Sequence, residues 1–165
     1  MATWLCFRAK PEEELIYLNL QKCVEVAEQV GGKDTHGFKF IQVPMGVAMP
    51  EAFTERWQEY DTQTVFGQTQ KDLKILVAVC NLLKMNVIAS KPLLEGRVSE
   101  VSIPQITNIK DPVSKHLQLV RSMPIRCLIT TLVGMKRIDN LKKNFEVIKT
   151  EPLTKEEFQK IMQIK

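Results

Sequence analysis

The sequence lacks long apolar runs, a dense block of charge of one sign and a high aromatic content. No run approaches the about 20 apolar residues that cross a bilayer, and the amino-terminal MATWLCFRAK has no basic leader before a long apolar core. The net charge of +4 comes from scattered cations, with no interleaved series of aromatics for base stacking. We therefore expect a cytoplasmic protein that binds neither membrane nor nucleic acid.

Cysteine and histidine are too few and too scattered for a metal or redox centre. The four cysteines stand in separate apolar stretches, and neither of the two histidines has a cysteine near it in sequence. No paired spacing indicates a zinc site or a reactive dithiol. We expect core thiols and no bound metal.

The length favours one domain, residues 1–165. A chain of 165 residues, 44% hydrophobic and 25% charged, can bury one ordinary core. A full (β/α)8 barrel needs about 250 residues, so this chain is too short for one.

Strand and helix patterns alternate along the chain. Near-continuous apolar strands between amphipathic helices are typical of a parallel sheet, so the predicted class is α/β. Strands are expected at 38–43, 86–90 and 126–133, with 3–7 as a candidate fourth. Helices are expected at 11–30, 50–60, 72–84, 112–123, 138–148 and 154–164, and irregular chain at 61–70 and 91–110.

A glycine turn followed by cations lies between the last apolar strand and the next helix. Gly134 precedes Lys136 and Arg137, and apolar residues then recur at helical spacing from Ile138 to Ile148. The free N–H groups at a helix start attract anions, and two cations would add charge-assisted hydrogen bonds. The pattern indicates a phosphate site, and the alternative is a plain strand-to-helix junction with solvated lysines.

Five short motifs follow one another along the chain. They are Ala2-Thr3-Trp4, FIQVP at 40–44, VIASKPLLEG at 87–96, VGMKRIDNLKKN at 133–144 and PLTKEE at 152–157. Their order resembles the C-terminal half of an aldo-keto reductase, a (β/α)8-barrel family that reduces aldehydes and ketones with a nicotinamide cofactor. The resemblance implies a half TIM-type barrel with about four parallel strands alternating with helices.

The resemblance also implies a site for NADP(H) at the carboxyl ends of the strands. Gln42 and Thr3 would hydrogen-bond the nicotinamide carboxamide, although the amide of Gln42 could instead serve a neighbouring backbone group. The other residues implied are Pro92, Leu93 and Gly96 over the pyrophosphate, Gly134 in the turn, Lys136 and Arg137 at the ribose phosphate, and Asn144 at the adenine.

Several features depart from the family's pattern. Ser90 stands where the family commonly has an aromatic that stacks on the nicotinamide, and Gly46 stands where an asparagine is frequent. The family's catalytic Tyr, Asp, Lys and His lie on the first four strands, and no motif in residues 1–165 matches them. Tyr17 and Tyr60 are expected to be packing residues, so we assign no catalytic residue and expect no carbonyl reduction by this chain alone.

Three interpretations follow from these patterns. The chain is half of a reductase, which associates with itself as a homo-oligomer or with an N-terminal half-barrel partner. Alternatively, it is a non-catalytic module that binds a nucleotide or another protein. The third interpretation is an open-sheet α/β protein unrelated to the barrel family.

Overall fold

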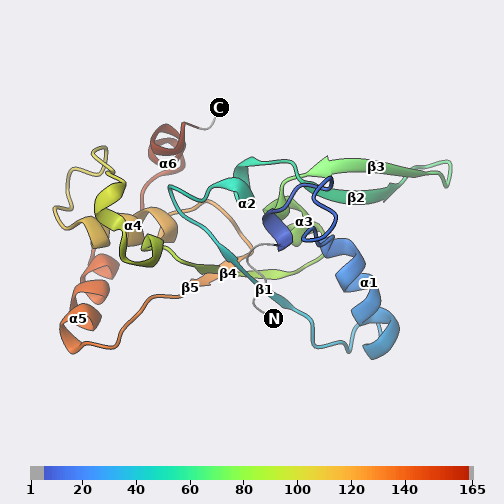
Figure 1. Cartoon of the computed structure of the whole chain (residues 1–165), viewed down its shortest axis with the longest axis horizontal. Coiled ribbons are helices and arrows are strands. Elements are labelled where there is room, and N and C mark those ends of the chain that lie inside the picture. Colours follow the sequence, from blue (N-terminus) through green and yellow to red (C-terminus); the bar gives the residue numbers. More distant parts are fainter. Residues whose placement is uncertain (1–5, 164–165) are drawn as a thin grey trace.

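The computed structural model of the chain describes residues 6–163. Its centre is a sheet of three parallel strands in the order β1 (Phe40–Pro44), β4 (Asn86–Ser90) and β5 (Leu128–Thr131). These strands fall within two residues of the predicted positions, and the α/β class is confirmed. Figure 1 shows the sheet in the middle of an elongated molecule.

The two faces of the sheet differ in burial. Ile41 and Val43 of β1 and Val87 and Ala89 of β4 are almost fully buried in the core, against the helices. On the opposite face Phe40 is 48% exposed and Gln42 and Ile88 are half-buried, whereas Pro44 and Ser90 at the strand ends are buried. Side chains alternate between the faces of a strand, so one face forms the core and the other is only partly covered.

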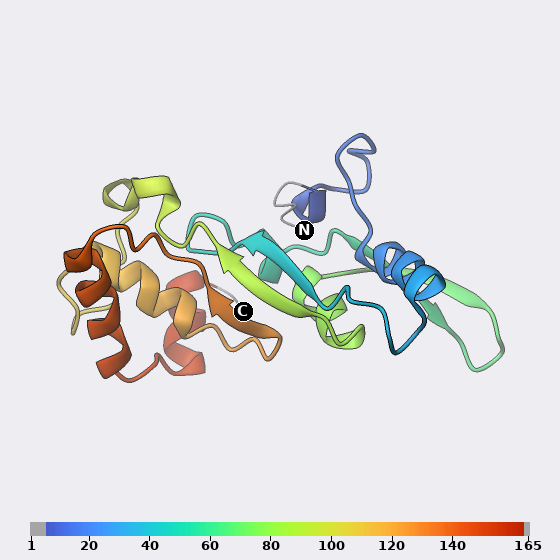
Figure 2. The same ribbon diagram turned by 90° about the horizontal axis from the view of Figure 1, so that it is seen from below.

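Helices gather at one end of the sheet (Figure 2). They are α4 (Pro112–Arg121), α5 (Ile138–Glu146) and α6 (Lys155–Met162), with the 3-10 turn η4 (Val147–Lys149) after α5. A capping box starts α6, as the sequence predicts: Thr154 and Glu157 each accept a hydrogen bond from the other's backbone N–H. The segment between β4 and α4 holds only the 3-10 turns η2 (Leu94–Gly96) and η3 (Val98–Glu100), in agreement with the irregular stretch expected there.

The first helix is shorter than predicted. Helix α1 covers Leu20–Gly31 and ends at the predicted glycine pair, with Gly32 at a positive φ of 81°. It starts at Leu20 rather than near Pro11, because the side chain of Asn19 caps it by accepting from the N–H of Lys22 at 3.0 Å. Residues 11–16 form turns instead, and proline with three glutamates did not start a helix there.

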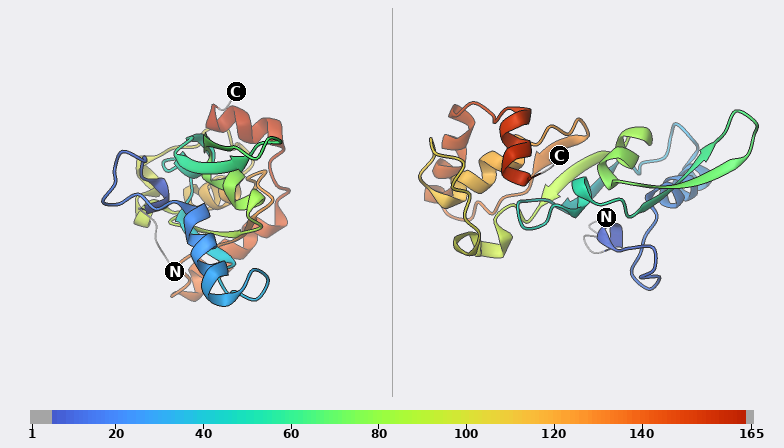
Figure 3. Two further views of the ribbon diagram at one scale, coloured as in Figure 1. Left: turned by 90° about the vertical axis from the view of Figure 1, so that its right-hand side faces the viewer. Right: turned by 90° about the horizontal axis from the view of Figure 1, so that it is seen from above.

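The region 50–74 contradicts the predicted helix and loop. Helix α2 is only Glu51–Thr54, and an antiparallel hairpin follows, formed by β2 (Gln58–Gln63) and β3 (Thr69–Lys74). The hairpin and α1 project from the other end of the sheet (Figure 3). Helix α3 is therefore reduced to Leu76–Leu82, because Asp72 to Lys74 pair with β2. Cross-strand pairing overrode the local helical spacing.

A half-barrel with four strands is not what the structure shows, since the parallel sheet has three strands within residues 6–163. The candidate strand at 3–7 meets a 3-10 turn, η1 (Cys6–Arg8), and its earlier residues, Thr3 included, lie outside the described residues. Phe7 of η1 is buried in the core, so this segment packs through a side chain instead of a strand ladder. Among the described residues no helix is long and apolar enough to span a membrane.

Candidate functional site

The carboxyl ends of the parallel strands bring three predicted cofactor residues together. Leu93 follows β4, Gly134 follows β5, and Asn144 lies on α5. All three line one small pocket of about 130 Å³. Parallel strands place their carboxyl ends at one edge of a sheet, which is where α/β proteins build binding sites.

The same pocket has lining residues that the sequence interpretation missed. Asn140 and Lys143 come from α5, and Asp111 and Val113 come from the start of α4. Asn140, Lys143 and Asn144 are three and four residues apart, so they share a helix face. That spacing was a usable signal for Lys143, whereas the contribution of α4 depends on how the two helices pack.

Two buried polar atoms near this edge have no hydrogen-bond partner within residues 6–163. They are Nδ2 of Asn144 and Oγ of Ser90, the last residue of β4. Buried polar groups in proteins are nearly always paired, and an unmade hydrogen bond costs about 1–3 kcal/mol. The donor on Asn144, beside the pocket, is the kind of group that a polar ligand could satisfy.

The predicted cations lie at the start of α5, outside the lining of this pocket. Lys136 and Arg137 are both exposed, and Arg137 is the N-cap residue of α5 without a side-chain capping bond. The first-turn N–H groups of α5 therefore keep their capacity to bind an anion. Asp139 in that turn adds a negative charge, which opposes an anion.

The remaining predicted residues are spread along the strand edge. Gln42 is half-buried on the open face of β1, level with Ile88 of β4, and within residues 6–163 its amide has no hydrogen-bond partner. Pro92 is buried after β4. Gly96 is exposed with φ 92°, a conformation that explains glycine there. Thr3 lies outside the described residues.

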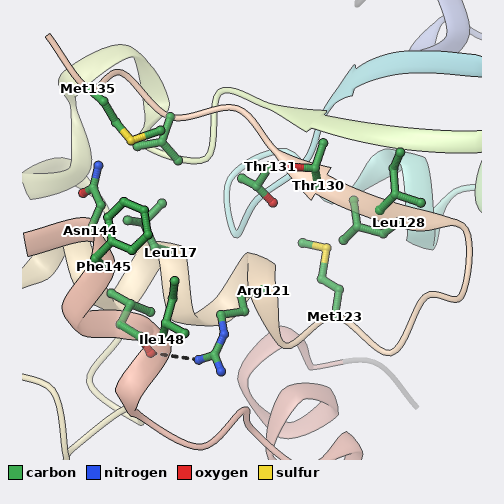
Figure 4. A pocket seen from close by; sticks show the side chains of 13 residues that line it. Leu117, Arg121, Met123, Leu128, Thr130, Thr131, Met135, Asn144, Phe145 and Ile148 are labelled. Carbon is green, nitrogen blue, oxygen red and sulfur yellow. Dashed lines mark hydrogen bonds between the residues drawn. The ribbon is translucent and has the colours of Figure 1, made fainter. Parts of the chain in front are cut away.

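A larger apolar groove of about 500 Å³ runs between β5, α4 and α5 (Figure 4). Phe145 and Ile148 enter it and are 56% and 60% exposed. Arg121 lies at its floor, where its guanidinium donates to the carbonyls of Val147 and Thr150 at 2.9 and 2.8 Å. The groove is therefore mostly apolar, and the one charged side chain in its lining has a terminal nitrogen hydrogen-bonded to backbone carbonyls.

The two tyrosines make structural contacts at the hairpin. The hydroxyl of Tyr17 accepts from the N–H of Glu59 at 2.9 Å, which ties the chain before α1 to the hairpin. Burial raises the pKa of the Tyr17 phenol above its ordinary 10.0. Tyr60 lies under the ammonium of Lys74, 5.9 Å from its ring. No cluster of metal-ligating side chains occurs among the described residues.

Comparison with known proteins gives a likeness of fold. No family model matches the sequence, and no curated protein matches it. A thermostable aldo-keto reductase, Tm1743, solved in complex with the inhibitor epalrestat, matches with a TM-score of 0.53 at 13% identity, over 84% of this chain and 44% of that chain.

The aldo-keto reductase AKR11C1 from Bacillus halodurans gives similar matches. Its apo form has a TM-score of 0.51 at 15% identity, over 86% of this chain and 54% of that chain. Its holo form has a TM-score of 0.52 at 15% identity, over 86% of this chain and 52% of that chain. The chain thus spans about half the length of these reductases, and its fold is part of theirs, as predicted.

Proposed function

We propose that this chain is the dinucleotide-binding half of an NADP(H)-dependent aldehyde or ketone reductase fold. The observation that carries the proposal is the meeting of Leu93, Gly134 and Asn144 in one pocket at the carboxyl ends of β4 and β5. The unpartnered Nδ2 of Asn144 gives this pocket a donor for an adenine ring nitrogen. The residues present therefore fit the adenosine end of the cofactor.

The other residues extend this assignment along the strand edge. Lys136 and Arg137, with the N–H groups that begin α5, would hold the ribose phosphate of NADP(H). Pro92 and Gly96 would border the pyrophosphate, and Gln42 and Thr3 would hold the nicotinamide carboxamide. The bound cofactor supplies hydride transfer.

The discriminating experiment compares NADPH with NADH. Lys136→Ala and Arg137→Ala should each weaken NADPH binding about tenfold, the loss of one charge-assisted hydrogen bond, and leave NADH nearly unchanged. Lys142→Ala, an exposed lysine on the same helix, is the matched control. Fluorescence titration measures both affinities. Equal losses for the two cofactors would refute the phosphate assignment.

We also propose that the isolated chain does not reduce carbonyls. Reduction needs a proton donor beside the hydride, and residues 1–165 contain none of the family's catalytic motifs. An assay with aldehyde substrates and NADPH should show no turnover. Clear turnover that depends on this chain would contradict the proposal.

The free state of all four cysteines supports a reducing, cytoplasmic setting.

A protein-interaction role is the second candidate, favoured by the exposed surface around β5. This strand is an edge of the sheet, and Ile129 on it is 51% exposed beside the groove that holds Phe145. Free strand edges and apolar patches of this kind promote association. We propose that a second copy, or an N-terminal half-barrel partner, covers this surface.

Light scattering after size exclusion tests self-association. Phe145→Glu should shift an oligomer to monomer. A monodisperse wild-type monomer at high concentration would argue against the second copy.

A further inference from the structure

A second polar cavity, separate from the pocket described above, adjoins the first turns of α4. It has a volume of about 250 Å³ and lies between the segment 98–103 and the first turns of α4. In Figure 1 this segment is drawn beside α4, at the end of the molecule away from the hairpin. Its lining shares no residue with the pocket of Leu93, Gly134 and Asn144. The polar side chains in its wall are Ser99, Ser102, Lys110, Lys115 and His116.

The charge in this cavity is positive and uncompensated. Neither Lys110 nor Lys115 forms an ion pair within the described part of the chain. No carboxylate lines the cavity. The neighbouring Asp111 is engaged as the N-cap of α4, where its Oδ2 accepts from the N–H and hydroxyl of Ser114, both at 2.8 Å. An anion would therefore meet two lysines and no competing acid.

One of these lysines is held in place. The ammonium of Lys115 on α4 donates to the carbonyl oxygen of Ile103 in the segment 98–103 at 3.1 Å. An ammonium has three donors, so two stay available for a ligand. Anchoring the ammonium in advance reduces the conformational entropy lost when a ligand binds.

The buried imidazole of His116 is the second, independent indication of a ligand. His116 is 1% exposed, and its Nε2 lies 2.9 Å from the carbonyl oxygen of Val101. A carbonyl only accepts, so Nε2 carries the proton and donates it. The other nitrogen, Nδ1, is buried without a hydrogen-bond partner within residues 6–163. Nδ1 is then an acceptor, and the partner it calls for is a donor, such as the hydroxyl of a singly protonated phosphate group.

We infer that this cavity binds a small oxyanion, namely the phosphate group of a small metabolite. Two lysines and two serine hydroxyls supply donors of the kind that phosphate oxygens accept, and the cavity is too small for a dinucleotide. The inference does not depend on the proposed binding of NADP(H), because the two sites use different residues. The binding of phosphate in this cavity and the binding of NADP(H) in the other pocket can therefore be tested separately.

Titration with inorganic phosphate at constant ionic strength, followed by NMR of the imidazole signals, tests this site. The chain has two histidines. His36, far from His116 in the sequence and within hydrogen-bond distance of the Lys39 ammonium, is the internal control. Phosphate should shift the His116 signals in a saturable way and leave those of His36 in place. Acetate in a parallel titration shows whether a carboxylate is accepted, and sodium chloride shows the effect of salt alone.

Variants decide whether the lysines bind the phosphate. Lys115→Gln and Lys110→Gln should each weaken phosphate binding about tenfold, as expected for one charge-assisted hydrogen bond. Lys84→Gln, an exposed lysine after α3, removes the same charge elsewhere and should leave the affinity unchanged. If Lys115→Gln perturbs folding through Ile103, the exposed Lys110 still provides the test. An unsaturable shift, an equal shift at His36 or an equal loss in Lys84→Gln would overturn the inference.

Discussion

Asn144 and Gly134 line the same small pocket, and the side-chain Nδ2 of Asn144 is buried there without a hydrogen-bond partner. An unsatisfied donor destabilises the ligand-free protein, so Asn144→Leu should raise the free energy of unfolding by about 1 kcal/mol. The same change should weaken NADPH binding. Urea unfolding and fluorescence titration measure the two effects.

Asn140→Leu is the matched control for Asn144, because Asn140 lines the same pocket from an exposed position on α5. It should leave the free energy of unfolding nearly unchanged. If Asn144→Leu destabilises the protein without ligand, the amide has a structural role and the assignment to adenine loses its support.

Gln58 links three segments from inside the core and is only 1% exposed. Its Oε1 accepts from the N–H of Leu20 at 3.0 Å, and its Nε2 donates to the carbonyls of Leu18 and Phe7 at 3.3 and 3.4 Å. Gln58→Leu leaves these backbone groups unpaired and should lower the free energy of unfolding by about 3 kcal/mol. Gln70→Leu, exposed on β3, should change it little. Comparable losses in the two variants would contradict this role.

The cap of α6 should stabilise the helix that carries Phe158 and Ile161 into the core. Removing the hydroxyl in Thr154→Ala should lower the free energy of unfolding by about 1 kcal/mol. Thr150→Ala, a threonine outside the capping box, should have little effect. Thermal or urea unfolding provides the measurement, and an unchanged Thr154→Ala protein would show that packing alone holds α6.

Stability should fall at alkaline pH. Burial raises the pKa of the Cys23 thiol above its ordinary 9.0 and that of the Tyr17 phenol above 10.0. The unfolded chain therefore loses these protons first, and the stability present below about pH 9 is lost as the pH rises through the folded values. Urea midpoints measured from pH 8 to 11 should decline, and less steeply in a Cys23→Ala, Tyr17→Phe double variant. A midpoint that rises over this range would be incompatible with the burial of these groups.

Local signals were sufficient where they acted within one element. The strand Asn86–Ser90 was predicted with the correct first and last residues, because a short apolar run between polar neighbours is typical of a buried strand. The capping box of α6 could also be predicted from the sequence, because its two partners, Thr154 and Glu157, are three residues apart. The hairpin was missed because β2 and β3 are polar, and their pairing, rather than their composition, stabilises them.

The sequence by itself determined the three parallel strands, the glycine end of α1, the capping box of α6 and the order of motifs that pointed to part of a reductase barrel. These depend on contacts between residues close in sequence. Only the tertiary structure decided that Leu93, Gly134 and Asn144 meet while Lys136 stays outside their pocket. It also decided that Lys115 and His116 close a cavity with the segment 98–103. Such meetings depend on how strands and helices pack in space, and no local pattern encodes that packing.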